Sequence, residues 1–366
     1  MAKPIRIAHI MGKMVGGGVE QVVMNYYRHI DHSKVQFDFL VDADSTLVPQ
    51  DEIESFGGRV FEVPPYQHIL LYQKVLTSLF KKEAWPIVHS HINSLSVFPL
   101  HAAKKAGVKI RIAHSHSMAG KGEPVRNAVK AILKTQANRY PTHRFACCRF
   151  AGEWLFGKKA QFDVIYNAVD LSRFAFSTEV RNQVRAELGF SDNQLVIGHV
   201  GRFASMKNHR FLIDTFCEVV KYRNNAVLIL VGSGDKEMMI KNWISQFGLE
   251  TQVLFLGQRN DVERLYQAFD VFALPSFYEG LSLVSIEAQR AGLPCYLSET
   301  ITQEANVTGR VCFLPITSPR LWAEKICSVE PGQRNDVDPE AFSDYDIYSA
   351  AEKLVTRYEK LAGGAL

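Results

Sequence analysis

The sequence predicts an α/β protein with two doubly wound domains, each built on a parallel sheet that helices cover on both faces. Short apolar segments alternate with longer segments of helical periodicity throughout the 366 residues, as expected where helical crossovers connect parallel strands. The alternation breaks once, at the polar and turn-forming residues Asn167–Phe174. A chain of this length suits two domains of ordinary size. We expect domains at residues 1–168 and 169–345, followed by a C-terminal segment, residues 346–366.

The predicted elements follow from the apolar periodicity. In the first half, strands are expected at Ile5–Ile10, Gln36–Val41, Arg59–Val63, Ile87–His91, Ile110–Ala113, His143–Cys147 and Asp163–Tyr166. In the second half they are expected at Leu195–Val200, Ala226–Val231, Val253–Leu256, Val271–Leu274 and Pro294–Leu297. Predicted helices include Val19–His29, Ser94–Ala106, His209–Lys221, Lys236–Phe247 and Leu283–Arg290. The last helix, about Ile347–Leu361, is amphipathic and requires an apolar surface to cover.

The composition predicts a soluble cytoplasmic protein. Apolar residues make up 47% and charged residues 22% of the chain, which is ordinary for a globular protein. No apolar run reaches the length of a membrane span, and the N-terminus lacks the hydrophobic region of a signal peptide. The six cysteines are scattered without zinc-binding spacing and are expected to be buried free thiols.

Positive charge is concentrated in the first half of the chain. Residues 66–159 contain 16 Lys and Arg against three acids, a net charge of 16 − 3 = +13. Within Pro124–Tyr140, Arg126, Lys130 and Lys134 follow one another at every fourth position beside apolar residues. A solvated helix explains such a stripe, but the surrounding excess favours a surface that rests on an anionic membrane. Nucleic acid is disfavoured because no aromatic residues interleave the stripe.

The stretch Pro275–Glu287 combines a strand end, a tight turn and a helix start. Gly280 is expected to adopt turn angles that other residues avoid, and Ser282 is a plausible N-cap. The free N–H groups at the start of the helix, including those of Leu281, Ser282 and Leu283, would then face a phosphate or a developing oxyanion.

Two carboxylates, Glu279 and Glu287, lie eight positions apart in this stretch. Eight helical residues rise about 12 Å, too far for the paired carboxylates of a glycosidase. We interpret them as separate acceptors that hold different parts of one long ligand. The alternative is that Glu279 is a turn residue and Glu287 belongs to a solvated helix face.

Val200–Asn208 follows the first strand of the second domain and contains Arg202 and Lys207. Two cations five positions apart across a loop can converge on one anion. Their chemistry suits a diphosphate, although either cation alone is consistent with a solvated loop.

A glycine cluster, Gly16, Gly17 and Gly18, follows the first strand. It is not a dinucleotide fingerprint, because the third required glycine is replaced by Gln21. Asp42 at the end of the second strand leaves a dehydrogenase as a weak alternative. The position of the cluster favours close backbone approach to a substrate over a merely flexible turn.

Ten of the twelve histidines lie before residue 171. His116 follows the fifth strand at a carboxyl end, where ligands bind in such sheets; His89, His91 and His114 are expected to be strand-end or core residues. Asp42-Ala43-Asp44 superficially matches a metal-binding D-x-D and is interpreted as a solvated loop. No metal site is predicted.

These motifs together resemble the family 4 retaining glycosyltransferases of the GT-B fold, particularly those that build bacterial capsules and exopolysaccharides. The resemblance rests on the E-x7-E pair, the G-R…K-N loop, the segment Leu256–Leu265 and the hinge Tyr166–Phe174, where Ala168 replaces the usual glycine. It implies that Glu279 and His116 meet the donor sugar and Glu287 the ribose. It further implies that Arg202 and Lys207 clamp the diphosphate, that the Arg259 backbone meets the base, and that the C-terminal helix returns to the first domain. Ser282 stands where many members have glycine, so the resemblance implies the fold but not the sugar specificity.

The implied activity is retaining, metal-independent transfer of a hexose from a nucleoside diphosphate sugar, with UDP expected, to a lipid-linked saccharide. No cofactor is implied, and the enzyme is expected in the cytoplasm at the inner face of the membrane. Three alternatives remain at this point: a sugar-nucleotide 2-epimerase of the same fold, a dehydrogenase, and a non-catalytic lipid-binding partner.

Overall fold

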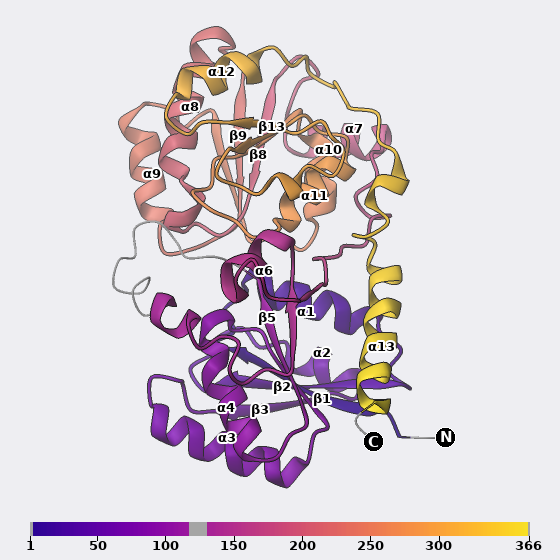
Figure 1. Cartoon of the computed structure of the whole chain (residues 1–366). Coiled ribbons are helices and arrows are strands. Elements are labelled where there is room, and N and C mark those ends of the chain that lie inside the picture. The colour runs from indigo at the N-terminus through magenta and orange to yellow at the C-terminus, as the bar shows by residue number, and fades with distance from the viewer. Residues whose placement is uncertain (1–2, 117–129, 365–366) are drawn as a thin grey trace. The chain divides into compact units, whose positions relative to one another are not determined.

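The computed structural model describes residues 3–116 and 130–364, and the chain divides into two compact units (Figure 1). Unit 1 comprises Met1–Ala168 together with Asp344–Leu366, and unit 2 comprises Val169–Ser343. The end of the chain therefore belongs to the same unit as its beginning.

Unit 1 is built on a seven-stranded parallel sheet in the order β3-β2-β1-β4-β5-β6-β7. The strands are β1 Ile5–Gly12, β2 Val35–Asp42, β3 Arg59–Val63, β4 Ile87–Ser90, β5 Ile110–Ser115, β6 His143–Ala146 and β7 Asp163–Val164. The helices are α1 Gly18–His29, α2 Gln50–Ser55, α3 Ile69–Glu83, α4 Val97–Lys105, α6 Arg149–Phe156 and α13 Ile347–Gly363, with a 3-10 turn η1 at Asn93–Ser96.

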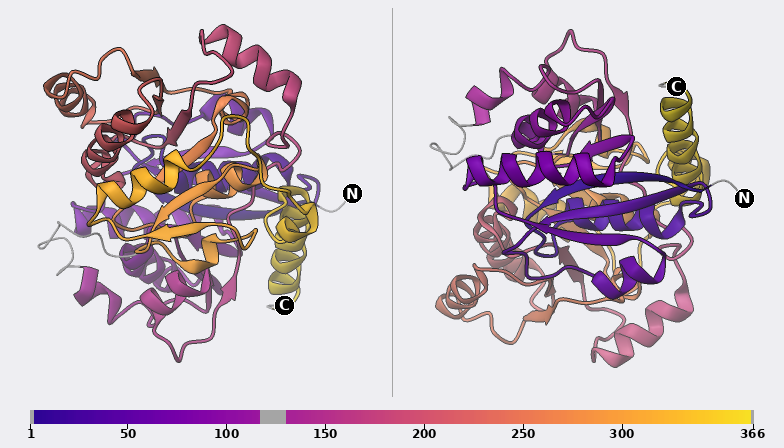
Figure 2. Two further views of the ribbon diagram at one scale, coloured as in Figure 1. Left: turned by 90° about the horizontal axis from the view of Figure 1, so that it is seen from above. Right: turned by 90° about the horizontal axis from the view of Figure 1, so that it is seen from below.

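The two faces of this sheet differ in chemistry because successive strand residues point to opposite sides. One face is apolar: Ile10 and Val88 belong to the same buried cluster as Leu76 of α3 and Leu100 of α4. The opposite face carries histidine and aromatic rings, and α13 lies beside it, next to α1 (Figures 1 and 2). The sheet thus supplies a dry apolar layer on one side and a buried polar layer on the other.

Unit 2 has a six-stranded parallel sheet in the order β10-β9-β8-β11-β12-β13. Its strands are β8 Val196–Val200, β9 Val227–Val231, β10 Val253–Gly257, β11 Val271–Leu274, β12 Cys295–Ser298 and β13 Cys312–Leu314. Its helices are α7 Thr178–Glu187, α8 His209–Tyr222, α9 Glu237–Gln246, α10 Val262–Ala268, α11 Leu283–Arg290 and α12 Pro319–Cys327, with 3-10 turns η2 Ser205–Lys207, η3 Gln303–Ala305 and η4 Pro339–Phe342. The strand order reverses between β8 and β11, which places the ligand crevice expected of such sheets after those two strands.

A buried carboxylate ties the elements of unit 2 together. Asp270, fully buried just before β11, forms ion pairs with Arg181 at 2.6 Å and Arg185 at 3.2 Å. Its oxygens also accept the N–H groups of Val196 and Gly332, each at 2.8 Å. Asp270 therefore joins α7, the start of β8 and the segment that leads to the end of unit 2.

The two predicted parallel sheets are confirmed, and all predicted strands are present with ends shifted by at most two residues. Three details differ. β13 was not predicted, the helix predicted at Ser94–Ala106 begins as the 3-10 turn η1, and the helical part of the predicted basic segment ends at residue 134. Across residues 3–116 and 130–364, no helix has the length and apolarity required to cross a membrane.

Candidate active site

The two motif loops of unit 2 meet at the point where its strand order reverses. The N–H group of Phe277, in the loop after β11, donates to the Met206 carbonyl at 2.8 Å. The Asn208 side-chain amide donates to the Pro275 carbonyl at 3.2 Å, and Asn208 itself adopts a left-handed conformation with φ of 54°. The G-R…K-N loop and the start of the E-x7-E stretch, distant in sequence, therefore form one structural unit.

At this junction Lys207 and Glu279 form a largely buried ion pair. Lys207 Nζ lies 2.7 Å from Glu279 Oε1, and the side chains are 12% and 10% exposed. The Ser276 hydroxyl donates to the same oxygen at 2.7 Å. A Cβ atom on Gly201 would lie 3.1 Å from Lys207 Cε. The absence of a side chain at Gly201 therefore leaves space for the aliphatic part of Lys207. Within the described part of the chain, all recorded contacts of the Glu279 carboxylate are made by Oε1.

Arg202 differs from Lys207 in its surroundings. It is exposed, and no ion pair of Arg202 is recorded among the residues that the structure describes. The structure therefore pairs Lys207 with Glu279 and leaves Arg202 at the surface, so their joint clamp on a diphosphate stays a prediction.

The start of α11 differs from the predicted geometry, and the binding of an anion there stays a prediction. Ser282 occupies the N-cap position, yet its side chain makes no capping hydrogen bond. Gly280 is not one of the described glycines with a positive φ, so the expected special turn angles are wrong. Leu281 and Ser282 are buried, with 3% and 6% exposure. In the first turn, the N–H groups of Ser285 and Ile286 donate to the Ser282 carbonyl at 3.2 and 3.4 Å. Helix geometry provides no intrahelical acceptor for the N–H groups of Leu283 and Val284.

Glu287 lies in the second turn of α11 and is not a solvated helix residue. The Tyr266 hydroxyl donates to Glu287 Oε2 at 2.9 Å. Burial raises the pKa of Glu287 to about 7, while the Tyr266 bond opposes that rise. The solvated-face alternative is therefore wrong, and the carboxyl group is held by a partner on α10.

The raised pKa of Glu287 predicts a pH dependence of stability. Between its ordinary value and about 7, the folded protein retains a proton that the unfolded chain releases. The contribution of Glu287 to the free energy of unfolding should therefore fall as pH rises through this window, by at most about 1.4 kcal/mol per pH unit, and should level off above it. Urea titrations should show the free energy of unfolding of wild type falling relative to that of Glu287→Gln across this window, because Asp42 and the buried histidines titrate in both proteins. The exposed Glu324→Gln is the control, and an unchanged slope in Glu287→Gln would contradict the assignment.

Arg259, whose backbone was expected to meet the base, lies at the surface after β10. Its guanidinium forms an ion pair with Asp261 at 2.7 Å. The side chain is thus engaged locally, which leaves the predicted contact to the backbone of the residue.

In unit 1 the glycine loop is closed by a carboxylate from α1. Glu20 accepts the N–H groups of Val15, Gly16 and Gly17, at distances from 2.6 to 3.1 Å. Gly16 has a positive φ of 79°, and Gly18 begins α1. The loop is therefore held by defined bonds, and three of its N–H donors already have an anionic partner.

His116 directly follows β5 and is buried. Its backbone N–H donates to Asn93 Oδ1 at 2.7 Å, and its Nε2 lies 2.9 Å from His91 Nδ1. Burial lowers the pKa of His116 to about 3, so the ring is neutral at physiological pH. No partner is recorded for its buried Nδ1 in the described chain.

The buried positions of His89, His91 and His114 confirm that they are core or strand-end residues. The expectation of a solvated loop at Asp42-Ala43-Asp44 is wrong for Asp42. Asp42 is the last residue of β2, is 3% exposed, and has a pKa raised to about 6 by burial and by Asp44. Asp44 is exposed and pairs with Lys13 at 2.8 Å. The pattern therefore runs from the buried end of β2 into an exposed turn at Ala43 and Asp44.

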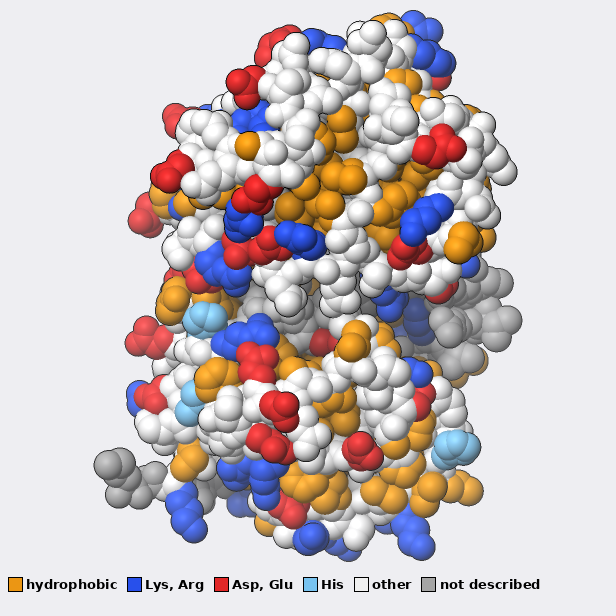
Figure 3. All heavy atoms as spheres, turned by 180° about the vertical axis from the view of Figure 1, so that it is seen from behind, with side chains coloured by type: hydrophobic (Ala, Val, Ile, Leu, Met, Phe, Trp, Pro, Cys, Tyr) orange, Lys and Arg blue, Asp and Glu red, His pale blue; other side chains and the backbone are white. Residues whose placement is uncertain are grey.

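The predicted basic stripe is only partly described. Arg126 lies outside the described residues. Lys134 Nζ lies 5.1 Å from the centre of the Trp154 ring, and Lys130 is partly buried. Between them, Ile132 is 69% exposed. On the face turned away from the viewer in Figure 1, Lys and Arg side chains are interspersed with Asp and Glu side chains (Figure 3).

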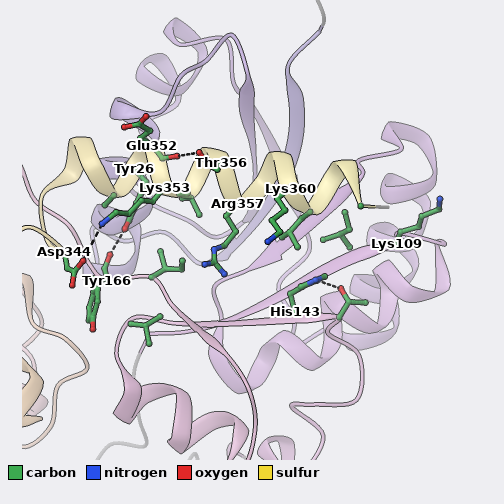
Figure 4. Close-up of a pocket in the computed structure, with 18 residues that line it drawn as sticks. Tyr26, Lys109, His143, Tyr166, Asp344, Glu352, Lys353, Thr356, Arg357 and Lys360 are labelled. Atoms are coloured by element: carbon green, nitrogen blue, oxygen red, sulfur yellow. Dashed lines mark hydrogen bonds and ion pairs between the residues drawn. The ribbon is translucent and has the colours of Figure 1, made fainter. Parts of the chain in front are cut away.

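A cavity of about 1090 Å³ lies in unit 1 between α13 and the ends of β5, β6 and β7. Arg357 and Lys360 project from α13 toward the side that holds His143 (Figure 4). Arg357 is paired with Asp163. None of the site residues predicted from the sequence lines this cavity.

Comparison with known proteins identifies the family. Residues 16–173 match the model described as Glycosyltransferase Family 4, and residues 180–328 match the model described as Glycosyl transferases group 1. EpsF of Bacillus subtilis, named a putative glycosyltransferase, is 35% identical over 334 residues, which cover 88% of this chain and 86% of EpsF. This chain is a family 4 glycosyltransferase.

Other relatives support the same assignment. An Escherichia coli enzyme named UDP-Gal:alpha-D-GlcNAc-diphosphoundecaprenol alpha-1,3-galactosyltransferase is 30% identical over 85% of this glycosyltransferase and 81% of the relative. HepE of Anabaena, solved with UDP-glucose, superposes with a TM-score of 0.74 at 19% identity, covering 98% of this chain and 99% of HepE. The predicted GT-B fold of the glycosyltransferase is thereby confirmed.

Sequence reasoning missed several residues that shape the site. Ser276 and Gly201 position the ion pair, and Glu20 fixes the glycine loop. A signal existed for Glu20, because an acid at the third position of a helix commonly bonds back to the residues before it. For Ser276 and Gly201 the signal was only their proximity in sequence to predicted residues of this glycosyltransferase.

Proposed function

We propose that this glycosyltransferase transfers a hexose, with retention of configuration, from a UDP-sugar to a lipid-linked saccharide in surface polysaccharide synthesis. The observation that carries the proposal is the buried Lys207–Glu279 pair at the β8/β11 reversal, beside the start of α11. A donor sugar nucleotide needs an acceptor for hydroxyl groups and positive charge for its diphosphate, and this junction provides both.

The chemistry follows from charge development. When the glycosidic bond breaks, the departing diphosphate gains negative charge, which preorganised cations and dipoles stabilise. Lys207 and the N-terminus of α11 are the groups proposed for this role, with Arg202 as a second cation. Glu279 is proposed to accept sugar hydroxyls through Oε2, and His116 to contact the sugar.

Glu287 is proposed to hold the ribose. A carboxylate accepts two hydroxyl protons better than a carboxylic acid does, and the pKa of Glu287 is about 7. We therefore expect UDP affinity to rise as pH increases through this value in wild type. The same dependence should be absent in Glu287→Gln, when both are measured by calorimetry.

The name of the E. coli relative supports UDP and a lipid diphosphate acceptor, and the complexes of HepE support a UDP-sugar. The direct test is a calorimetric titration of the purified chain with UDP, GDP, ADP and NAD, followed by UDP-glucose and UDP-galactose. UDP should bind and the other nucleotides should bind at least tenfold more weakly. Binding of NAD alone, or of no nucleotide, would remove the proposal.

A 2-epimerase and a transferase are separated by their products. A transferase releases UDP from the donor only when a lipid-linked acceptor is supplied, for example in a membrane extract. An epimerase converts the free sugar nucleotide without an acceptor. Nuclear magnetic resonance of the donor with and without extract distinguishes the two.

We also propose that the segment around Lys130 and Lys134 rests on an anionic membrane, with Ile132 entering the interface. Each basic residue near such a surface contributes about 1 kcal/mol. Lys130→Glu with Lys134→Glu should therefore reduce cosedimentation with phosphatidylglycerol vesicles by about 30-fold or more. The matched control reverses two lysines of unit 2, Lys221 and Lys241. Equal loss of vesicle binding in both double variants would refute a specific membrane-binding face at Lys130 and Lys134.

A further inference from the structure

Five histidines form a buried layer on one face of the unit 1 sheet. His9 lies on β1, His89 on β4 and His114 on β5, while His91 and His116 come directly after β4 and β5. The three strands are neighbours in the sheet, and residues two apart on a strand share a face. All five side chains are at most 6% exposed. The arrangement places ten ring nitrogens in a space where most proteins bury apolar side chains.

His9, His91 and His116 are joined in a chain. His9 Nδ1 lies 2.9 Å from His91 Nε2, and His91 Nδ1 lies 2.9 Å from His116 Nε2. A neutral imidazole carries one proton, so each ring can donate one of these bonds and accept the other. The outer nitrogens, His9 Nε2 and His116 Nδ1, have no recorded partner in the described residues.

His114 belongs to a second chain that begins on the C-terminal helix. The Tyr358 hydroxyl lies 2.7 Å from His89 Nδ1, and His89 Nε2 lies 3.1 Å from His114 Nδ1. The remaining nitrogen, His114 Nε2, is buried without a recorded partner in the described chain. An unpaired buried nitrogen costs free energy, so its retention points to a ligand.

We propose that His91, His114 and His116 bind a divalent transition-metal ion such as Zn²⁺. One ligand atom from each of the three rings lies within 4.8 Å of the others, so small ring movements reach the separation of nitrogens around a tetrahedral ion. Three neutral imidazoles and no thiolate suit Zn²⁺, Co²⁺, Ni²⁺ or Cu²⁺. A water molecule would complete the coordination.

The outer nitrogens of two ligands are already held, as in established metal sites where a ligating histidine donates its other N–H to a neighbour. His91 is held through His9, and His114 is held through His89 and Tyr358. These outer partners orient the ligand rings before an ion arrives.

Proton counting shows that the site can form without any ring gaining or losing a proton. In one direction of the chain, His116 Nε2–H donates to His91 Nδ1, and His91 Nε2–H donates to His9 Nδ1. To ligate the ion, His116 moves its proton to Nδ1, which frees its Nε2 and the lone pair on His91 Nδ1. Each ring keeps one proton throughout, and His116 retains Nδ1–H for another partner.

A second group, His9, His89 and His91, also has ligand atoms within 4.8 Å. It is the weaker candidate because two of its rings, His89 and His91, have both nitrogens hydrogen-bonded, whereas in the first group only His91 does. The two groups share His91, so variants of His9 and His114 are needed to distinguish them experimentally. The metal proposal shares His116 with the proposed sugar contact but no residue with the Lys207–Glu279 pair, and metal binding is measured without nucleotide, so either proposal can fail alone.

The test uses the full chain, treated with a chelator and then titrated with Co²⁺ and Zn²⁺. We expect one equivalent of Co²⁺ with the visible absorption of a tetrahedral site, displaced by Zn²⁺. His114→Gln and His116→Gln should abolish stoichiometric binding. His89→Gln should weaken it by about 10–100-fold, as loss of an outer partner does. The matched control is His32→Gln, which removes a half-buried ring stacked on Phe56 and should leave binding unchanged.

X-ray absorption of the Zn²⁺-loaded wild type keeps the proposal testable even where a variant fails to fold. Three imidazole nitrogens at about 2.0 Å would support it. Absence of stoichiometric binding, binding that survives His114→Gln, or a first shell of thiolate or carboxylate ligands would overturn it. Binding lost in His9→Gln but retained in His114→Gln would move the site to the other group and refute this assignment.

Discussion

Lys207→Ala is expected to lower sugar transfer by about 10²–10³-fold, the usual effect of removing one preorganised group that stabilises developing negative charge. It should also lower the free energy of unfolding by about 3 kcal/mol, because Glu279 is left buried without its cation. UDP release from the donor in the presence of membrane extract reports transfer, and urea unfolding reports stability.

A double variant separates these two effects. Lys207→Met with Glu279→Gln removes both charges, so stability should return to near wild type while transfer stays low. Lys221→Ala, which removes an exposed lysine of α8, is the control and should change neither quantity. Recovery of transfer in the double variant would show that the pair is structural only.

Asp270→Ala is expected to have the largest effect on stability, about 3–5 kcal/mol, because two buried guanidinium groups lose their shared carboxylate. Arg181 and Arg185 are 8% and 2% exposed at their side chains. We expect unit 2 to unfold at lower temperature. The increase in melting temperature that UDP is expected to cause should be lost as well. Scanning calorimetry with and without UDP measures both.

The control for this variant is Asp261→Ala, which removes an exposed ion pair with Arg259. Exposed pairs contribute about 0–1 kcal/mol, so its melting temperature should stay close to wild type. Similar destabilisation by both variants would contradict a special role for the buried network.

The fold was predictable because its signal is local. Each strand is an apolar run next to a helical period, and parallel connections restrict the topology. β13 was missed because Cys312–Leu314 is only three residues long, too short for periodicity to detect. The site motifs were found in sequence, but the pairing of Lys207 with Glu279 depends on β8 and β11 being neighbours, which no local pattern specifies.

The histidine layer shows another limit. Close spacing of Cys and His is the usual sequence signal of a zinc site, whereas the proposed ligands come from separate strands. The available signal was the repeated H-x-H at two successive strand ends, since alternate residues share a face. The contribution of Tyr358 depends on α13, near the end of the chain, and it could not be inferred from spacing.

The discontinuity of unit 1 has a consequence for biosynthesis. Residues 344–366 complete this unit, yet a ribosome makes them only after all of unit 2. At ordinary translation rates that delay is on the order of ten seconds. During this interval the nascent chain lacks Tyr358 and the helix beside the histidine layer, so that sheet face is open to chaperones and to wrong contacts. Premature termination anywhere after unit 2 would therefore damage the first part of the protein to be synthesised.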